Sequence, residues 1–291
     1  RLIEGEYFRI DQMLSSDYET KVTVNKKEFL DCIDRASILI RENDKKPIII
    51  DIQDGAMELQ INSAMGSMKE EIDIQKEGKD ILHLTLSSGI SGVINSAKIA
   101  QSMMQEKYPD RKIYVIDSLA ASSGYGLLMD KLADLRDEGK SIDEVYAWAE
   151  EHKKEVQHWF FTSDLTFFIK GGRVSKAAGF IGGVMNICPL LNVDFEGKLI
   201  PRQKVRTKKK VIQAIVGKME ENAKDGLDYS GKCYISQSAC LEDAQSVAKL
   251  IEERFPKLNG KVEIYSIGTT IGSHTGPGTV ALFFWGKERI N

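Results

Sequence analysis

The stretch Ile81-Leu82-His83-Leu84-Thr85-Leu86-Ser87-Ser88-Gly89-Ile90-Ser91-Gly92 decides the fold class. Its first six residues form a short apolar run typical of a buried strand, and the next six form a polar loop that contains glycine. A segment with helical spacing follows at 93–105, and the same order returns in strand 113–116, loop 117–124 and helix 125–135. This alternation predicts a parallel sheet with helical crossovers, which is an α/β fold.

Composition sets the class of protein. The chain has 291 residues, of which 42% are hydrophobic and 29% charged, and its formal net charge is −3. This balance is typical of a globular protein with room for two domains. Because the chain has no overall basic character, we expect no nucleic-acid partner.

Cysteine and histidine spacing argue against a metal site. Four cysteines occur without a C-x-x-C pair, and four histidines form no ligand cluster. We therefore expect neither a metal nor a cofactor. The apolar runs are too short to span a membrane and the first residues do not resemble a signal peptide, so the expected compartment is the cytoplasm.

The C-terminal part is expected to mix helices and strands. Ser141-Ile142-Asp143-Glu144 is a capping box, which predicts a helix running to about His158. A further helix is expected at 241–254. Strands are expected at 233–236, 262–267 and 280–285.

Two serine-containing loops are candidates for anion binding. They place Ser88, Gly89 and Ser91 in one loop, and Ser118 and Ser122 in the other. Both loops end a predicted parallel strand and open a helix, so both face the crevice where ligands usually bind. For either loop alone, the simpler interpretation is that its serines cap a helix.

Two further segments carry groups that suit an anion. In Lys170-Gly171-Gly172-Arg173 the two glycines permit close backbone approach, and the arginine offers a planar donor. In Gly272-Ser273-His274-Thr275-Gly276-Pro277-Gly278 a histidine is held among turn residues. Taken singly, each is more often a solvated surface turn.

The basic run Arg202 to Lys210 allows three interpretations: a nucleic-acid patch, a solvated helix start, or a source of one inward arginine. It contains no aromatic residue on which a base would stack. We interpret most of it as solvated, with Arg206 as the member used by a site.

In combination these segments resemble the DegV family, the acyl-binding subunits of bacterial fatty acid kinases, over residues 80–291. The motifs that carry the resemblance, in the family's order and spacing, are Leu86-Ser87-Ser88-Gly89-Ile90-Ser91-Gly92, Val115-Ile116-Asp117-Ser118, Ser163-Asp164-Leu165, Lys170-Gly171-Gly172-Arg173, Pro189-Leu190-Leu191, Lys204-Val205-Arg206 and His274-Thr275-Gly276-Pro277-Gly278. The family usually has Ser-Gly-Thr where this chain has Ser91-Gly92-Val93.

The resemblance implies a two-domain α/β protein that encloses one long-chain fatty acid in an apolar tunnel. It implies that a separate ATP-dependent kinase subunit phosphorylates the carboxylate, with an acyltransferase or, transiently, a membrane surface as a further partner. Residues implied to contact the carboxylate are Ser88, Ser91, Arg173, Arg206 and His274, beside the backbone of Gly89, Ser118, Ser122, Gly171 and Gly172. No residue is assigned a catalytic role.

Burial of the alkyl chain would drive binding. About fourteen methylenes of a C16 acid at ~0.8 kcal/mol each contribute on the order of 10 kcal/mol. The buried carboxylate must then be hydrogen-bonded. Candidate wall residues, which serve equally well as core, are Phe167, Phe168, Ile169, Phe180, Ile181, Val184, Met185 and Ile187.

The first eighty residues have a different pattern. Alternating runs predict strands at 22–24, 48–52, 57–61 and 70–74, with an Asp54-Gly55 turn and a helix at 26–41. They resemble the bacterial DNA polymerase III β sliding clamp through Leu2-Ile3-Glu4-Gly5-Glu6-Tyr7, Val22-Thr23-Val24, Lys27-Glu28-Phe29-Leu30, Asp34-Arg35-Ala36-Ser37-Ile38-Leu39, Asp51-Ile52, Asp54-Gly55 and Glu70-Glu71-Ile72-Asp73-Ile74. The segment amounts to half of one clamp repeat, which predicts a chimera joined near 76–80.

This division leaves alternatives open. The domains expected are 1–80, 81–160 (a partial first DegV-like domain) and 161–291. Asn62 and Ser63 are the nearest equivalent of a Thr-Ser segment that contacts the carboxylate in the family. The other hypotheses are a DNA-associated clamp relative, a non-functional fusion, and an enzyme acting on a phosphate ester through Arg173 and His274.

Overall fold

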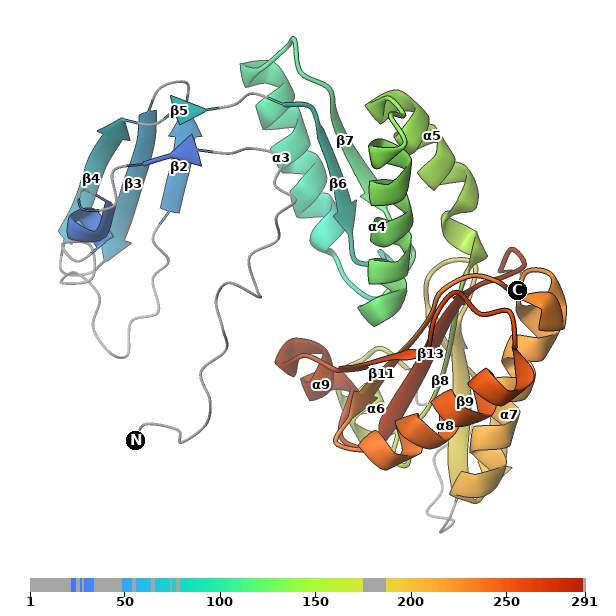
Figure 1. The fold of residues 1–291 in the computed structure, drawn as a ribbon. Coiled ribbons are helices and arrows are strands. Elements are labelled where there is room, and N and C mark those ends of the chain that lie inside the picture. Colours follow the sequence, from blue (N-terminus) through green and yellow to red (C-terminus); the bar gives the residue numbers. More distant parts are fainter. Residues whose placement is uncertain are drawn as a thin grey trace. The chain divides into compact units, whose positions relative to one another are not determined.

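The chain forms two compact units, Arg1–Ile81 and Leu82–Asn291. The computed structural model describes residues 22–24, 27, 29–33, 49–53, 56–63, 66–73, 75–76, 79–174 and 187–289 (Figure 1).

The N-terminal unit is built from antiparallel strands. β1 (Val22–Thr23) pairs with β5 (Gln75–Lys76), and β2 (Ile49–Gln53), β3 (Ala56–Ser63) and β4 (Gly66–Asp73) form a three-stranded sheet in that order. Its small core contains Cys32, Met57 and Leu59. The predicted β2–β3 pairing is confirmed, whereas the strand expected to start at residue 70 starts at Gly66, because it pairs with β3 along the full length of both strands. The predicted Asp54-Gly55 turn lies outside the described residues.

The C-terminal unit begins with two strands that end side by side. β6 (Ile81–Thr85) and β7 (Ile113–Asp117) form a two-stranded sheet joined by helix α3 (Val93–Lys107). The Ser118 N–H donates to the Thr85 carbonyl at 3.2 Å, and the Ser87 N–H donates to the Ala120 carbonyl at 3.0 Å. The loops after both strands therefore lie at the same edge, as the alternating pattern predicts.

The larger part of this unit is a mixed six-stranded sheet in the order β10-β9-β8-β13-β11-β12 (Figure 1). The strands are β8 (Val156–Phe161), β9 (Ile187–Val193), β10 (Leu199–Arg206), β11 (Cys233–Ser238), β12 (Glu263–Ser266) and β13 (Thr279–Trp285). The helices are α4 (Ser122–Asp137), α5 (Ile142–His152), α6 (Thr166–Lys170), α7 (Lys208–Asn222), α8 (Leu241–Arg254) and α9 (Thr269–Thr275), with 3₁₀ turns at Lys153–Glu155 and Gly226–Asp228.

Alternation along the strands divides the core between the two faces of this sheet. In β13, Val280, Leu282 and Phe284 pack with α7 and α8, while Ala281 and Phe283 pack with α4 and α6. Successive strand residues point to opposite faces, so one continuous apolar run serves both layers. The predicted α/β class is confirmed.

Two local predictions were wrong, those for the end of the Ser141 helix and for the position of His274. The helix opened by Ser141 ends at His152, because Val156–Phe161 is a run of six buried residues that forms β8. The basic run is exposed, as its solvated interpretation predicts: Arg202, Lys204 and Arg206 lie in edge strand β10, where charged side chains protect the unpaired edge, and residues 208–210 open α7. His274 lies in α9 and not in a loop.

Candidate functional site

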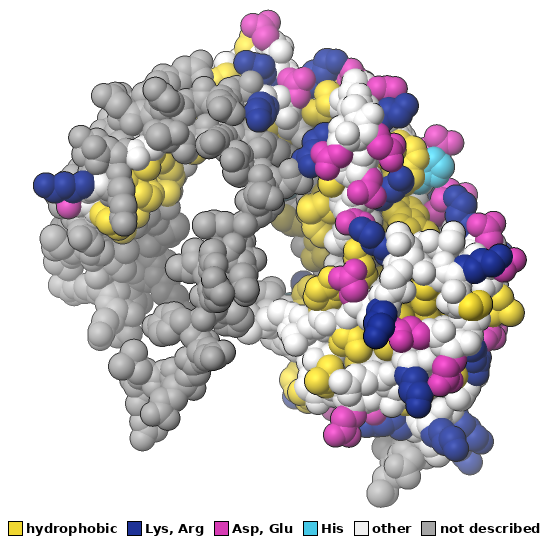
Figure 2. All heavy atoms as spheres, viewed as in Figure 1, with side chains coloured by type: hydrophobic (Ala, Val, Ile, Leu, Met, Phe, Trp, Pro, Cys, Tyr) yellow, Lys and Arg dark blue, Asp and Glu magenta, His cyan; other side chains and the backbone are white. Residues whose placement is uncertain are grey.

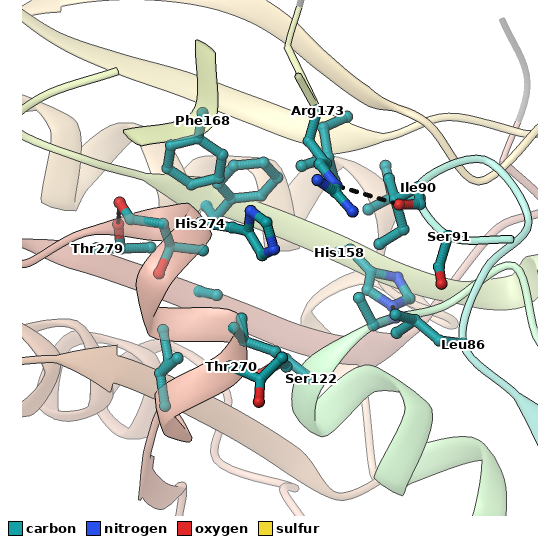
Figure 3. Close-up of a pocket in the computed structure, with 18 of the residues that line it drawn as sticks. Leu86, Ile90, Ser91, Ser122, His158, Phe168, Arg173, Thr270, His274 and Thr279 are labelled. Atoms are coloured by element: carbon teal, nitrogen blue, oxygen red, sulfur yellow. Dashed lines mark hydrogen bonds between the residues drawn. The ribbon is translucent and has the colours of Figure 1, made fainter. Parts of the chain in front are cut away.

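A cavity of about 210 Å³ lies within the C-terminal unit, and most of its lining is apolar (Figure 3). Its apolar wall is formed by Leu86, Ile90, Ala121, Phe160, Phe168, Val193, Leu199, Ile267, Ile271, Ala281 and Phe283. Its polar lining residues are Ser91, Ser122, His158, Arg173, Thr270, His274, Thr275 and Thr279. For comparison, an engineered apolar cavity of about 150 Å³ accommodates benzene.

Strand alternation supplies the floor of the cavity. His158 and Phe160 on β8 pair across the sheet with Phe283 and Ala281 on β13, and all four residues line the cavity. Their neighbours Trp159 and Leu282 face the opposite core. The side-chain period of two therefore separates cavity-lining residues from those under α7 and α8.

One side of the cavity, which we call the loop wall, consists of the loop 117–124, through Ala121 and Ser122, together with His158 of β8. Leu119 and Ser122 have φ values of 49° and 54°, in the left-handed region that residues other than glycine rarely adopt. The Ala121 N–H donates to His158 Nε2 at 3.3 Å, and the Ser122 hydroxyl donates to Ser236 Oγ at 3.0 Å. The strained turn is thus fixed by contacts to two strands of the large sheet.

Arg289 anchors the same wall from the C-terminal end of the described chain. Its buried guanidinium donates to the carbonyls of Leu119 at 2.9 Å and Asp194 at 3.1 Å, and also to those of Lys153 and Lys154. Burial lowers the pKa of Arg289 to about 10, so the side chain is still a cation at neutral pH. One side chain therefore connects the β7–α4 loop to the turn after β9.

His158 is a neutral member of the loop wall. Burial, and secondarily the charge of Arg289, hold its pKa well below the ordinary value of 6.5. Its Nδ1–H donates to the Val156 carbonyl at 2.9 Å, and its Nε2 accepts from Ala121. Both ring nitrogens are therefore engaged within the protein.

A second group of cavity residues, which we call the helix wall, consists of Ser91, Arg173, Ile267 and residues of α9. Ile267, Thr270, Ile271, His274 and Thr275 line the cavity at the spacing of one helical face. Close packing holds α9 against α6: a Cβ at Gly171 would lie 2.6 Å from His274 Nδ1, and one at Gly276 would lie 2.3 Å from the Phe167 ring. These glycines are required because the two segments approach so closely.

The helix wall carries hydrogen-bond donors that can meet a ligand. Arg173 donates through Nε to the Ile90 carbonyl at 3.2 Å and through Nη1 to the Gly171 carbonyl, which leaves Nη2 without a partner among the described residues. His274, adjacent to Arg173 in Figure 3, likewise has no hydrogen-bond partner within these residues. Ser91 accepts from the Val93 N–H at 3.3 Å and keeps its own O–H for a ligand.

The structure brings together only part of the residues that the sequence predicted for the site. Ser91, Arg173, His274 and Ser122 line one cavity, and Gly171 packs directly against His274. Ser88 is exposed, with its N–H bound to Asp117 Oδ1, and Arg206 is exposed at the end of edge strand β10. Neither of these two lines the cavity, so their placement gives no support to a contact with a carboxylate.

The remaining predicted positions have structural environments of their own. Gly89 packs on the backbone of Gly197, where a Cβ would lie at 2.5 Å, and Gly172 forms a turn with φ of 72°. Ser118 is buried, and its hydroxyl bonds within its own loop to Ala120. Asn62 and Ser63 lie in β3 of the N-terminal unit, where they pair with Ser67 and Gly66. Their predicted part in the site stays a prediction.

Sequence reasoning missed His158, Thr275 and Thr279. His158 was placed at the end of a helix, and the signal that could have corrected this is the apolar run from Val156 to Phe161, which fits a buried strand. Thr279 becomes a cavity residue because β13 pairs with β8 in the sheet that carries Phe160, and Thr275 because α9 lines the same cavity.

Within the described residues, no group of three or more His, Cys, Asp or Glu side chains is placed to hold a metal ion. No helix in that part of the chain is long and apolar enough to cross a membrane. On the face shown in Figure 2, cationic and anionic side chains of the C-terminal unit are interspersed.

The C-terminal unit is an α/β fold with helices on both faces of a mixed sheet, and it contains an apolar pocket. The chain belongs to the DegV family: the model of an uncharacterised protein of the DegV family matches residues 59–287. A DegV domain-containing protein of Clostridium perfringens is 39% identical over 214 residues, which is 74% of this chain and 72% of that protein. One of Lactococcus lactis is 39% identical over 205 residues, 70% and 69% of the two chains.

Solved structures show the same fold. The fatty acid kinase B3 protein of Streptococcus pneumoniae, loaded with linoleic acid, matches with a TM-score of 0.65 and 28% identity, over 72% of this chain and 73% of that chain. A protein of Thermotoga maritima, described as revealing a fatty acid binding function, matches with a TM-score of 0.59 and 29% identity, over 72% and 70%.

A second family model matches the N-terminal unit. It describes the C-terminal domain of the DNA polymerase III beta subunit and covers residues 11–87. Both predicted resemblances are therefore confirmed. The DegV match begins earlier than expected, so the two matches overlap over residues 59–87, a stretch that includes the predicted join.

Proposed function

We propose that the chain binds one long-chain fatty acid, with its carboxylate against the helix wall and its alkyl chain along the apolar lining. The observation that carries this proposal is an apolar cavity into which Ser91, Arg173 and His274 present unused donors. A carboxylate placed there receives charge-assisted hydrogen bonds. The solved relatives of Streptococcus pneumoniae and Thermotoga maritima, described with bound fatty acid or fatty acid binding, support it.

The partition of the lining fits an amphiphile. Phe160, Phe168 and Phe283 offer aromatic surface to methylenes, and each buried methylene contributes about 0.8 kcal/mol to binding. Donors on the helix wall offset the desolvation of the carboxylate. The loop wall provides shape, because the His158 ring and the Ser122 hydroxyl are already bonded within the protein.

We further propose that the chain presents the carboxylate to a separate ATP-dependent kinase and catalyses nothing alone. In that step a carboxylate oxygen forms a bond to the γ-phosphorus of ATP while the bond to ADP breaks, which gives an acyl phosphate. The structural similarity to the fatty acid kinase B3 protein supports this partner.

The binding proposal is tested by native mass spectrometry of the chain purified from bacteria, followed by solvent extraction and fatty-acid analysis. We expect one C14–C18 acid per chain. Delipidated protein is then titrated with palmitate and with hexadecanol, which has the same alkyl chain without the charge. Palmitate must bind more tightly, and protein that stays empty when palmitate is offered contradicts the proposal.

The kinase step is tested separately. Loaded protein is mixed with ATP and a fatty acid kinase catalytic subunit, and acyl phosphate is trapped by hydroxylamine as the hydroxamate. We expect product only when chain, kinase and ATP are all present. Product formed by the chain and ATP alone would contradict a carrier role.

A further inference from the structure

The floor of the cavity carries one small side chain between two aromatic pairs. In the sheet, Ala281 of β13 pairs with Phe160 of β8, and Phe283 pairs with His158. All four residues line the cavity. Three of them present rings and one presents a methyl group, so the floor of the cavity is lowest at Ala281.

The rings on either side of Ala281 are held in place by aromatic contacts. Phe160 stacks on Phe168 of α6, with ring centroids 5.6 Å apart and an angle of 22° between the planes. His158 meets the Phe283 ring edge-on, with centroids 5.3 Å apart. Phe168 and His158, one from each pair, lie apart in Figure 3. Because a ring that moved over Ala281 would lose its partner, the space above this residue is retained.

A second small residue marks where this space ends. Ser236 of β11 pairs with Ala281 from the other side. Its hydroxyl bonds to those of Ser122 at 3.0 Å and Ser123 at 2.7 Å, both in the first turn of α4. Ser236 is buried and lies outside the cavity lining. The start of α4 therefore covers Ser236, and along this row of the sheet the open space begins at Ala281.

We propose that the alkyl chain of the ligand crosses the sheet over Ala281, between the two aromatic pairs, and that the size of this side chain determines the acyl-chain length that is accepted. This inference rests on the proposed function and concerns the alkyl chain, not the carboxylate. A larger side chain at this position takes the space of methylenes, and each methylene excluded from the cavity lowers the affinity about fourfold.

The test is a titration of delipidated wild type and Ala281→Leu with octanoate, dodecanoate and palmitate. Leucine adds roughly three methylene equivalents to the floor. We expect the loss of affinity to grow with chain length, from less than about threefold for octanoate to about 10- to 100-fold for palmitate. Ala281→Val adds less bulk on a branched side chain that suits a strand, and it must show the same trend with smaller losses.

The thermal unfolding midpoint of the ligand-free protein separates a cavity residue from a packed one. Filling an open apolar space does not overpack a core, so we expect Ala281→Leu to unfold at the same or a higher temperature than the wild type. The matched control is Ala244→Leu, because Ala244 of α8 is fully buried in the core on the opposite face of the sheet. That substitution should lower the midpoint and leave the chain-length profile unchanged.

Four results overturn the inference. Equal losses for the three acids, no loss for any of them, or a midpoint lowered as much by Ala281→Leu as by Ala244→Leu each do so while the fatty-acid proposal stands. If Ala281→Leu does not fold, the same criteria applied to Ala281→Val decide. A wild-type protein that binds none of the acids overturns the proposed function and the inference together.

Discussion

The two walls of the cavity use polar groups in opposite ways. In the loop wall, His158 and Ser122 bond to other protein groups, and Arg289 holds the Leu119 carbonyl. In the helix wall, Arg173 and Thr275 retain donors that have no partner among the described residues. The chain therefore has one wall of satisfied polar groups and one wall of unused donors around the same apolar space.

Backbone strain lies in the loop wall, whereas the donors available to a ligand lie in the helix wall. Left-handed residues such as Leu119 and Ser122 persist only where surrounding contacts determine their conformation. The loop wall meets that condition through bonds to β8 and β11 and to Arg289. The helix wall can then hold uncompensated donors next to a surface whose shape is fixed.

The largest expected effect comes from disturbing the loop wall at Gly124. A Cβ there would lie 2.2 Å from His158 Nε2 and 2.7 Å from Phe283, both of which are buried. We expect Gly124→Ala to lower the free energy of unfolding by about 3 kcal/mol through overpacking. Urea denaturation measures this change.

Gly126 provides the matched control for this substitution. It lies in the same helix, and a Cβ there would meet no heavy atom within 4 Å. Gly126→Ala should therefore stabilise the protein by about 0.5–1 kcal/mol through helix propensity. Equal effects of the two substitutions would show that the loop wall is not tightly packed on His158.

The second effect falls on the helix wall and on affinity. Arg173→Met removes the guanidinium, so we expect palmitate affinity to fall about 10- to 100-fold while hexadecanol affinity changes less than about threefold. Titration of delipidated protein measures both constants. Lys209→Met, at an exposed cation outside the cavity, is the control for net charge. An equal loss in both variants would mean that Arg173 acts only through long-range charge.

Parts of this comparison could be predicted from the sequence. The order of apolar runs and polar loops along the chain predicted the succession β6–α3–β7–α4. The helix predicted at 241–254 is α8, which has the same bounds, Leu241–Arg254. The family resemblance predicted that Arg173, His274 and Ser91 belong to one site, and in the structure all three line one cavity. Local pattern is informative where a single period of 2 or 3.6 dominates.

The loop wall could not be predicted in the same way. His158 gains its role because β8 joins the sheet beside β13, a pairing that brings together residues more than a hundred positions apart. Arg289 looks like a solvated terminal arginine in sequence, yet it donates to four backbone carbonyls. Such contacts depend on tertiary packing and leave no local periodicity.

A third effect concerns pH and tests whether His158 is neutral. Because burial holds its pKa well below 6.5, the unfolded chain takes up a proton before the folded chain as the pH falls. The free energy of unfolding must then decrease as the pH drops below about 6.5, by up to about 1.4 kcal/mol per pH unit. His158→Gln should show a shallower decrease between pH 7 and 5 in urea denaturation.

The histidine control is His83→Gln, because His83 is exposed on β6. Its stability should follow the same pH profile as the wild type. A wild-type profile in His158→Gln as well would mean that folded His158 takes up its proton over the same pH range as the unfolded chain, so that the loop wall would gain a cation next to Arg289 at low pH.

The smallest effects come from a pair of serines that line the same cavity. Ser122 bonds to Ser236, whereas the O–H of Ser91 is available to a ligand. We expect Ser122→Ala to lower the free energy of unfolding by about 1 kcal/mol with palmitate affinity changed less than about threefold. Ser91→Ala should instead weaken palmitate binding about 3- to 10-fold with little change in stability.

Together, the two serine variants test whether polar residues of the loop wall and of the helix wall have different roles. If Ser122→Ala weakens palmitate binding and Ser91→Ala destabilises the empty protein, then the bond to Ser236 breaks when ligand enters and both walls contact the head group. Alternatively, Ser122→Ala changes only stability and Ser91→Ala changes only palmitate affinity. In that case the hydrogen bonds of the empty protein identify which polar residues shape the cavity and which bind its ligand.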